Sequence, residues 1–385
     1  MSTGYPTGAN RVRMAMIGGG PGSFIGPVHR KAAALDGLVS LCAGAFSPDP
    51  ERNRETSLQL GLPPDRIHED YEALLAREAD RPAPERPEFV AIVTPNHLHA
   101  PIAAAALARG FAVLCEKPLA RNLAEARDLQ RAVESSGAAF AVTYTYLGYP
   151  LVHEARSIIA SGGIGAIRRV VVNYTQGWLA QPVERHGNRQ AAWRTSPETA
   201  GVGGALGDIG VHAQSLAEFV TGSDIAEVSA DIRATFPERR LDDDGAMLLR
   251  FADGARGTLI ASQICAGDEN RLDLRVYGER GALHWTQESP NHLWHRAIDG
   301  PARLITANPD LLSDGGARAM TRLPGGHPEG YIEAFANLYR AFVLSLRGEE
   351  APFMPGVREG VRSMAFIEAA IASSRANGAW QPVTG

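Results

Sequence analysis

The sequence predicts two domains: a doubly wound α/β domain, followed by an α+β domain with a large, mostly antiparallel open sheet. Three observations predict this organisation. The chain has 385 residues, more than the ~250–300 that one hydrophobic core organises. Residues 11–143 alternate strand-like apolar runs with helix-like segments, whereas the residues after 143 carry β-branched runs separated by glycine turns. We therefore expect domains at residues 1–143 and 144–385.

Composition narrows the class of protein. The chain is 44% hydrophobic and 21% charged, and it has no apolar run near the ~20 residues that span a bilayer. A net charge of −5 provides no field that attracts nucleic acid, so we expect a small-molecule partner. Residues 1–10 lack a basic stretch followed by an apolar core, which favours a cytoplasmic protein. Cys42, Cys115 and Cys265 are expected to be reduced and structural, with a catalytic thiol as the alternative.

The first strand, Arg11–Ile17, leads into a glycine-rich loop, and a helix-like segment, Val28–Leu35, follows it. Glycines allow a pyrophosphate to approach the backbone, and the amides at the start of the next helix face its negative charge. Ser23 stands where the G-x-G-x-x-G pattern has its third glycine, and Gly22 and Gly26 offer a lengthened version. The candidate cofactor-binding residues in this loop are Gly18, Gly20, Gly22, Ser23 and Phe24.

The second strand, Leu38–Phe46, ends at Ser47, about where a dinucleotide fold places the residue that faces the adenosine ribose. An acid at this position would have favoured NAD clearly. Ser47 with Arg52 and Arg54 leaves room for a ribose phosphate, although arginines on a solvated helix face are an equally good explanation. We expect NAD as the cofactor, and the choice between NAD and NADP stays open.

The remaining elements of the first domain follow in alternation. A capping box at Asn122 and Glu125 predicts the start of the last helix, and Gly137 predicts its end. The other expected elements are helices at Tyr71–Ala79 and Ile102–Arg109 and strands at Phe89–Val93, Phe111–Cys115 and Ala139–Thr143.

Polar residues follow two of these strands, and ligands of such sheets bind beyond the carboxyl ends of the strands. Thr94-Pro95-Asn96-His97-Leu98-His99 follows one strand and Glu116-Lys117-Pro118 follows the next. Two histidines two residues apart, with no cysteine or acid cluster beside them, make a poor metal site. We therefore expect no metal and interpret these groups as lying near the cofactor. The candidates are Thr94, Asn96, His99, Glu116 and Lys117.

With the glycine loop, the Thr-Pro-Asn-His segment and the Glu-Lys-Pro segment, nearly the whole chain resembles the Gfo/Idh/MocA family of glucose-fructose oxidoreductases and inositol dehydrogenases. Gly207-Asp208-Ile209-Gly210-Val211-His212 looks like the second signature of that family. The resemblance implies a Rossmann domain followed by a sheet, open on one face, that commonly mediates dimers or tetramers. It also implies that Lys117 and His212 flank the nicotinamide, with Asp208 beside them.

The chemistry supports these three candidates separately. Oxidation of a secondary alcohol needs a base near neutral pH and a cation or donor near the oxygen. Asp208 and His212 lie four residues apart on a predicted helix, so that the acid can orient the imidazole. A surface lysine and a buried core histidine are the structural alternatives. We predict Lys117, Asp208 and His212 as catalytic, with His212 as the base and Lys117 as its electrostatic partner.

The second domain is predicted from strands at Arg168–Gln176, Glu227–Phe236, Ala246–Phe251, Arg256–Gln263 and Leu272–Tyr277, with a final helix over 357–376 that packs back on the body. Aromatic rings with nearby polar groups are typical of sugar sites, and core packing is the alternative for each ring. Arg185, Arg189 and Arg194 can meet an anionic group on the substrate or remain solvated. The predicted substrate-binding residues are Tyr146, Gln176, Trp178, Arg189, Trp193, Arg194 and His212.

The sequence thus favours an NAD(P)-dependent oxidoreductase that transfers hydride between a secondary ring hydroxyl of a sugar, glycoside or cyclitol and the nicotinamide. The alternative is a glycoside hydrolase that uses NAD transiently: oxidation of the sugar, elimination of the aglycone and re-reduction. A third possibility is a cofactor-sensing protein without chemistry, which intact Lys117 and His212 argue against. We expect a homodimer or homotetramer.

Overall fold

The computed structural model describes residues 11–385; the residues on which the expectation of no secretory signal rests lie outside this range. The chain forms two compact units. The first holds the residues up to Ala120, Ala124–Thr143 and Tyr331–Gly360, and the second holds Arg121–Leu123, Tyr144–Gly330 and Val361–Gly385. Residues 331–360 therefore belong to the first unit, whereas the sequence analysis places them in the second.

The first unit is built on a five-stranded parallel sheet with the order β2-β1-β3-β4-β5. The chain leaves β1 for β2 on one side and then returns to β3 on the other. The order therefore reverses between β1 and β3, the position at which such sheets bind their ligands. The strands are β1 (Val12–Gly18), β2 (Val39–Ala45), β3 (Phe89–Val93), β4 (Ala112–Cys115) and β5 (Phe140–Val142).

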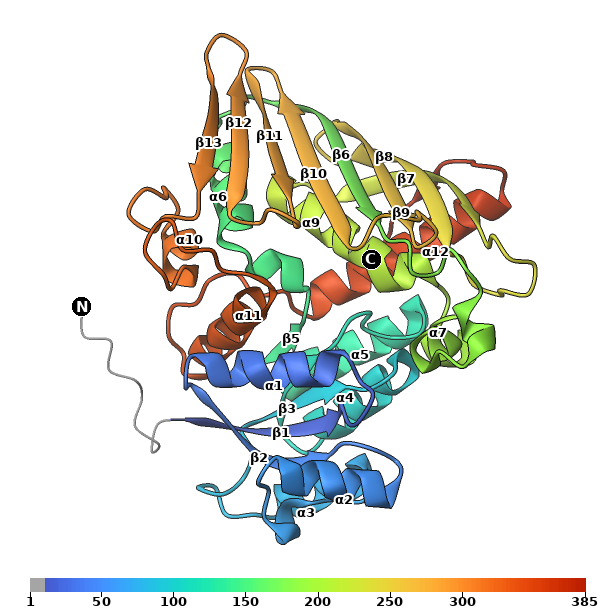
Figure 1. The fold of residues 1–385 in the computed structure, drawn as a ribbon, viewed down its shortest axis with the longest axis vertical. Helices are drawn as coiled ribbons and strands as arrows, with labels where there is room; N and C mark the ends of the chain where they lie inside the picture. Colours follow the sequence, from blue (N-terminus) through green and yellow to red (C-terminus); the bar gives the residue numbers. More distant parts are fainter. Residues whose placement is uncertain (1–10) are drawn as a thin grey trace. The chain divides into compact units, whose positions relative to one another are not determined.

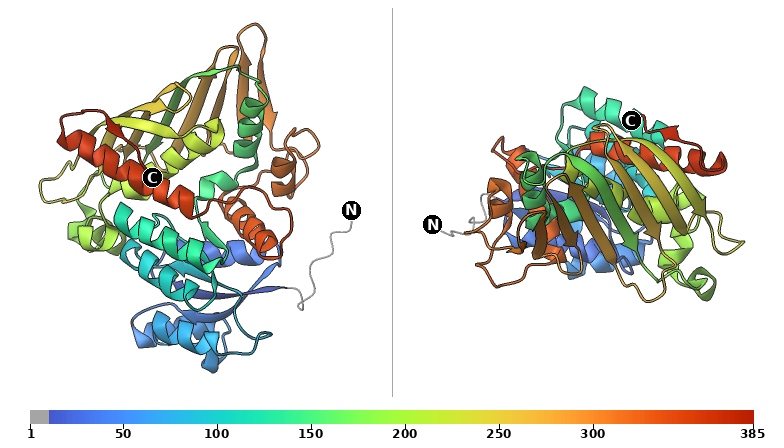
Figure 2. Two further views of the ribbon diagram at one scale, coloured as in Figure 1. Left: turned by 180° about the vertical axis from the view of Figure 1, so that it is seen from behind. Right: turned by 90° about the horizontal axis from the view of Figure 1, so that it is seen from above.

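Helices cover both faces of this sheet (Figures 1 and 2). One face is covered by α1 (Ile25–Leu35) and α11 (Tyr331–Leu346), which pack against each other, and the core beneath them includes Phe89, Phe335 and Phe342. On the opposite face lie α4 (His99–Leu107) and α5 (Leu123–Ser136). The helices α2 (Pro50–Gln59) and α3 (Tyr71–Ala79) complete the unit.

The second unit is built on a nine-stranded sheet with the order β13-β12-β11-β10-β6-β9-β8-β7-β14. Within this sheet, as far as the described residues show, β6 and β9 pair in parallel and every other pair is antiparallel. The strands are β6 (Ile167–Thr175), β7 (Ile225–Arg233), β8 (Asp244–Phe251), β9 (Arg256–Ser262), β10 (Arg271–Gly278), β11 (Gly281–Thr286), β12 (His292–Ala297), β13 (Ala302–Thr306) and β14 (Gln381–Pro382).

One face of the nine-stranded sheet is packed and the other is open. The helices α6 (Pro150–Ala160) and α9 (Val211–Thr221) pack on the first face, where Leu249, Leu259 and Val172 are buried. The right view of Figure 2 looks onto the strands of this sheet. Helix α12 (Val357–Arg375) follows α11, and short helices α7 (Arg189–Arg194), α8 (Pro197–Ala200) and α10 (Gly315–Met320) lie in connections.

The predicted fold class is confirmed: a parallel Rossmann-like sheet precedes a largely antiparallel sheet. The five predicted strands of the second sheet correspond to β6 to β10, with ends that differ by at most three residues. No helix among residues 11–385 is long and apolar enough to cross a membrane.

Candidate active site

The glycine loop follows β1, and several of its glycines, Gly20 and Gly26 among them, have no room for a side chain. A Cβ on Gly20 would lie 2.5 Å from the Phe46 carbonyl oxygen. A Cβ on Gly26 would lie 2.2 Å from the Gly19 carbonyl oxygen. Gly26, in the first turn of α1, therefore has the close-packing role of the third glycine, three residues later than in G-x-G-x-x-G. The glycines of this loop therefore still allow a pyrophosphate to approach the backbone.

The other loop residues take different roles. The Ser23 hydroxyl accepts a hydrogen bond from the Gly26 amide at 3.1 Å, which fixes the start of α1. Phe24 is 66% exposed, so its ring is available to a ligand, and a Cβ on Gly22 would meet nothing within 4 Å. Arg30, which the sequence analysis did not single out, donates from Nη1 to the Gly19 carbonyl at 2.9 Å and so braces the loop.

The segment after β2 forms the start of α2. The Ser47 hydroxyl accepts from the Asp49 amide at 3.1 Å, and the Asp49 carboxylate caps α2 by accepting from the Arg52 amide at 3.0 Å. The Arg52 guanidinium is exposed and lies 4.0 Å from Asp49. Asp49 is therefore an acid two residues after Ser47, but its carboxylate is used to cap α2. Because Arg52 is exposed, the choice between NAD and NADP, which carries a ribose phosphate, stays open.

His99 joins the ends of two neighbouring strands. Its ring is buried, with Nδ1 2.7 Å from the Pro118 carbonyl oxygen and Nε2 2.9 Å from the Thr94 carbonyl oxygen. Burial lowers the pKa of His99, although both carbonyls favour the protonated ring. The contacts make His99 a brace between β3 and the segment after β4. Asn96 is buried nearby in sequence, and no metal-binding group of three or more acids, histidines or cysteines occurs in residues 11–385.

Glu116 is a buried carboxylate directly beside Lys117 in the chain. It accepts from the His29 ring at 2.9 Å, from the Thr143 hydroxyl and from the Lys117 amide at 3.2 Å. His29 in turn contacts the Tyr339 hydroxyl at 2.8 Å. Burial alone would raise the pKa of Glu116, but these hydrogen bonds and the charges of His29 and Lys117 outweigh it and lower the pKa to about 2.

Through these hydrogen bonds Glu116 holds the segment that carries Lys117 in place. The half-buried Lys117 projects from a peptide that β4, β5, α1 and α11 hold in place through Glu116. The sequence analysis assigned Glu116 to cofactor binding and did not single out His29 or Tyr339, because their partners lie far away along the chain.

In the second unit, His212 lies on α9 among tyrosine rings. Its own exposure is 6%. The centroid of its ring is 4.9 Å from that of Tyr146, 6.0 Å from that of Tyr144 and 6.2 Å from that of Tyr174. The Tyr146 and Tyr144 rings meet it at 84° and 90°, in edge geometry. Such surroundings restrict the orientation of the imidazole and exclude water from its sides.

A continuous hydrogen-bond network begins at these tyrosines. The Tyr146 and Tyr174 hydroxyls bond each other, and Asn270 accepts from Tyr174 at 2.7 Å and from the Gln176 amide at 2.7 Å. The Gln176 carbonyl accepts from Trp178 at 3.0 Å and from Gln263 at 3.2 Å. Predicted residues Tyr146, Gln176 and Trp178 are thus brought together.

The network continues to Asp208. Its Oδ2 accepts from the Gln263 amide at 2.9 Å and from the Arg194 guanidinium at 3.3 Å. The guanidinium and the amide therefore both donate to the same carboxyl oxygen of Asp208. Arg194 also lies 4.1 Å from the Trp193 ring centroid and 5.9 Å from that of Trp178, so both tryptophans flank the same guanidinium.

The local backbone differs from the helix that the sequence analysis predicted. Leu206–Gly210 forms a π-helical turn, and the α-helix begins at Val211. The Asp242 carboxylate holds the approach to this turn by accepting from the Gly204 and Leu206 amides at 2.7 Å each. A π-turn has more residues per turn than an α-helix, so the four-residue spacing does not place Asp208 directly above His212. Such turns occur frequently at functional sites.

The predicted arginines separate into different environments. Arg194 is part of the network, whereas Arg189 is exposed at the first position of α7. Arg185 forms an ion pair with Glu238. The three side chains therefore have separate neighbours, which weakens the interpretation that they act together on one anionic group.

Three network members, Tyr174, Gln263 and Asn270, are absent from the predicted site residues. They lie on β6, after β9 and before β10, so only strand pairing brings them together. One signal was available: Tyr174 alternates with Val172 and Val170 and thus shares the packed face of β6.

The chain combines an NAD-binding Rossmann domain of an oxidoreductase with a C-terminal domain of the same family. Residues 12–144 match the family described as "Oxidoreductase family, NAD-binding Rossmann fold", and residues 152–284 match "GFO/IDH/MocA C-terminal domain". The chain is 31% identical over 380 residues to the uncharacterized oxidoreductase YfiI of Bacillus subtilis, which covers 96% of each chain. The chain therefore belongs to the Gfo/Idh/MocA family.

Similar proteins have been solved with cofactor and substrate. An inositol dehydrogenase homolog from Azotobacter vinelandii complexed with NAD⁺ has a TM-score of 0.92 at 35% identity, covering 97% of this chain and 98% of that chain. The complex with NADH and myo-inositol has a TM-score of 0.89 at 34% identity and the same coverage. Levoglucosan dehydrogenase of Pseudarthrobacter phenanthrenivorans is 27% identical over 409 residues, covering 97% of this chain and 98% of the relative.

Proposed function

We propose that the protein is a dehydrogenase that oxidises a secondary ring hydroxyl of a cyclitol, sugar or sugar anhydride with NAD. The observation that carries this proposal is the hydrogen-bonded network that joins Tyr146 to Asp208 in the unit that follows an NAD-binding Rossmann domain. Neighbours of this chain are described as bound to myo-inositol and to levoglucosan, both of which carry ring hydroxyls.

The residues proposed to hold the cofactor are those of the cradle after β1 and the braced segments after β3 and β4. Gly18, Gly20 and the amides at the start of α1 would face the pyrophosphate, and Thr94 and Asn96 follow the strand beside them. NAD, when bound, accepts the hydride that leaves the alcohol carbon. The preference for NAD over NADP is part of the proposal. Arg52 and Arg54 are both exposed, so their guanidinium groups leave room for the ribose phosphate of NADP.

His212 is proposed as the base that removes the hydroxyl proton, because its ring is held between tyrosine edges on one rigid helix. Asp208 is proposed to orient the reacting group as an ionised acceptor. Lys117 supplies positive charge for the developing oxyanion, and its backbone is fixed by the Glu116 carboxylate. Each of these three residues is held in position by other residues of this chain.

Substrate hydroxyls are proposed to meet the polar groups of the network, and the faces of Trp178 and Trp193 would pack against C–H groups of the ring. The alternation of amide, hydroxyl and carboxylate in this network suits a ligand with several neighbouring hydroxyls. Arg194 is paired with Asp208, which favours a neutral polyol over an anionic substrate.

The experiment that tests the proposal is incubation of the purified protein with NAD, and separately NADP, with myo-inositol, levoglucosan, free sugars and chromogenic glycosides. Reduced-cofactor absorbance and aglycone release are followed together. Net NADH from a cyclitol or sugar supports the dehydrogenase. Aglycone release that requires NAD without net NADH would instead identify a redox-assisted glycoside hydrolase, and no turnover of any kind would contradict both activities.

We also propose that the open face of the nine-stranded sheet forms the contact between copies of the chain. It carries exposed apolar side chains on five strands: Leu248, Ile260, Tyr277, Trp294 and Leu304, with exposures between 36% and 52%. A row of large apolar residues on one sheet face is typical of a protein interface. The expected assembly is a homodimer or homotetramer.

A further inference from the structure

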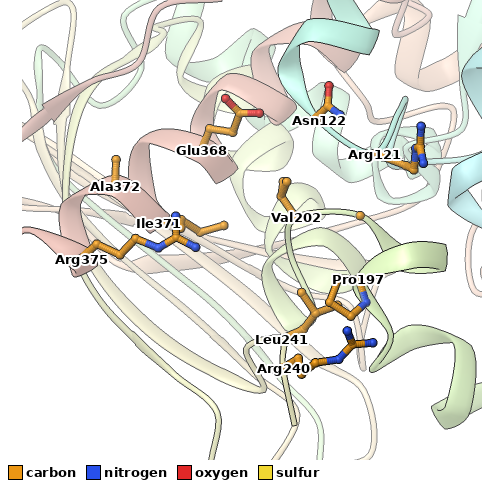
Figure 3. A pocket seen from close by; sticks show the side chains of 11 residues that line it. Arg121, Asn122, Pro197, Val202, Arg240, Leu241, Glu368, Ile371, Ala372 and Arg375 are labelled. Carbon is orange, nitrogen blue, oxygen red and sulfur yellow. The ribbon is translucent and has the colours of Figure 1, made fainter.

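The second unit contains a cavity that is separate from the tyrosine and glutamine network. Its volume is about 610 Å³, within the range of small-molecule pockets. The walls come from the segment just before α5, from α8 and the segment after it, from the segment before β8, and from the last turns of α12 (Figure 3). None of the catalytic or substrate-binding residues proposed above lines it.

The walls carry an excess of positive charge. Three arginines, Arg121, Arg240 and Arg375, line the cavity against a single carboxylate, Glu368. That carboxylate accepts a hydrogen bond from the Leu123 amide at 2.8 Å and so is already used at the start of α5. The lining thus holds three guanidinium groups and one carboxylate, and Glu198, outside the lining, pairs with Arg240.

The arginines differ in how they are held. Arg240 forms a two-pronged pair with Glu198, with distances of 2.7 and 2.5 Å, so its guanidinium is fixed in direction. Arg375 is exposed in the last turn of α12, and no residue of the described chain forms an ion pair with it. In Figure 3 its side chain extends toward Ile371. Arg375 is the cation available to a ligand.

The rest of the lining is apolar. Val202, Leu241, Ile371, Ala372 and Pro197 contribute hydrocarbon to the walls. Val202, although a large aliphatic residue, is 36% exposed. A ligand that matches these walls combines an oxyanion, which pairs with a guanidinium through two hydrogen bonds, with an apolar body that covers the aliphatic side chains.

Two segments of the cavity wall are joined through their backbones. The Val202 amide donates to the Arg121 carbonyl at 2.9 Å. A Cβ on Gly201 would lie 2.5 Å from the same carbonyl oxygen, so the two segments meet backbone to backbone. A cavity bounded by fixed backbone retains its shape when it is empty, which lowers the ordering cost of binding.

We propose that this cavity is a binding site for a small organic anion, a phosphate or carboxylate attached to an apolar body, with Arg375 as its main anion-binding residue. The site is independent of the proposed dehydrogenase chemistry, because it shares no residue with that network.

The test is isothermal titration calorimetry of the full-length protein, saturated with NADH, with phenyl phosphate, benzoate and inorganic phosphate as separate probes. We expect millimolar or tighter binding of phenyl phosphate or benzoate, whichever oxyanion fits, and weaker binding of inorganic phosphate. Arg375→Gln should weaken the organic probe at least about tenfold, the loss expected for a charge-assisted contact. Ala372→Glu, an exposed position in the wall, should abolish binding.

Arg303→Gln is the matched control, since Arg303 is an exposed arginine on the edge strand β13. It should leave the affinity unchanged. Absence of binding to the wild-type protein, equal binding by wild type and Arg375→Gln, or an equal loss in Arg303→Gln would each overturn the proposal. None of these results depends on turnover, so a failure here is distinguishable from a failure of the proposed dehydrogenase.

Discussion

At the level of single residues, both units contain a carboxyl group that accepts hydrogen bonds from residues on other elements. Glu116 is braced by His29 and Thr143, and Asp208 is held by Arg194 and Gln263. The partners of Glu116 lower its pKa to about 2, so its carboxylate is ionised at neutral pH and cannot act as a proton donor there. The partners of Asp208 fix the direction of its carboxyl group.

His212→Asn is predicted to lower kcat by about 10²–10⁴, because an amide fills a similar space but cannot accept the proton. The affinity for NADH should stay within about twofold of wild type, since the nucleotide is proposed to bind the other unit. Steady-state kinetics with the substrate found in the panel and a fluorescence titration with NADH measure the two quantities. His292→Asn, an exposed histidine on β12, is the control, and unchanged turnover in His212→Asn would remove His212 from the mechanism.

Glu116→Gln is predicted to destabilise the protein by about 1.5–3 kcal/mol at neutral pH, because it removes a hydrogen-bonded buried charge. The pKa of Glu116 lies near 2, below its ordinary value of 4.5. The stability that this carboxylate contributes is therefore complete above pH 4.5 and is lost as the pH falls from 4.5 toward 2. Denaturant unfolding at several pH values should show a smaller acid-induced loss in the variant. An identical pH dependence in both proteins would contradict this account.

Sequence reasoning found the chemistry-bearing residues more readily than the residues that hold them. Lys117, Asp208 and His212 stand in motifs that local spacing makes visible. His29, Tyr339, Gln263 and Asn270 are separated from their partners by dozens to hundreds of positions, and no local pattern reports such a contact. The catalytic and binding roles themselves remain predictions.

At the scale of elements, the glycine loop shows how a lengthened motif keeps its geometry. Gly26 lies against the Gly19 backbone. In G-x-G-x-x-G the third glycine, which has this role, stands three residues earlier. Gly26→Ala is predicted to displace α1 from the loop and to raise the Kd for NADH at least about tenfold, because helix and loop can no longer meet.

Fluorescence titration with NADH checks this prediction. Gly137→Asn is the control, because Gly137 has open space around it and a left-handed backbone that asparagine tolerates. If Gly26→Ala binds NADH as tightly as Gly137→Asn does, the close-packing role of Gly26 is wrong.

Elements with a clear period were predictable, and elements set by tertiary context were not. The parallel strands are short apolar runs followed by polar residues, which is why their positions agreed closely. Helix α11 has an equally clear period, with Phe335, Phe342 and Val343 buried on one side, but nothing local indicates that it joins the first unit. The π-turn at Leu206–Gly210 reads as an ordinary helix, because the Asp242 contacts that hold its first residue come from another segment.

At the scale of the whole molecule, the open sheet face predicts the assembly. Tyr277→Glu and Trp294→Glu should each shift the protein toward monomers, since a charge in a buried apolar contact is costly. Sedimentation velocity measures the change. Leu311→Glu, at an exposed leucine in a loop, should leave the assembly as it is. A monomeric wild-type protein, or an assembly unaffected by both sheet variants, would exclude this face as the contact.

The central claim is that the protein removes hydride from a ring carbon for net oxidation. The most direct measurement uses a ring-deuterated form of the substrate found in the panel, with NAD, and follows the products by NMR. A dehydrogenase places deuterium at C4 of the reduced nicotinamide, in equal amount to a ketone on the substrate ring. Deuterium returned to the sugar with release of an aglycone and no net NADH, or deuterium that never reaches the nicotinamide, would contradict the claim.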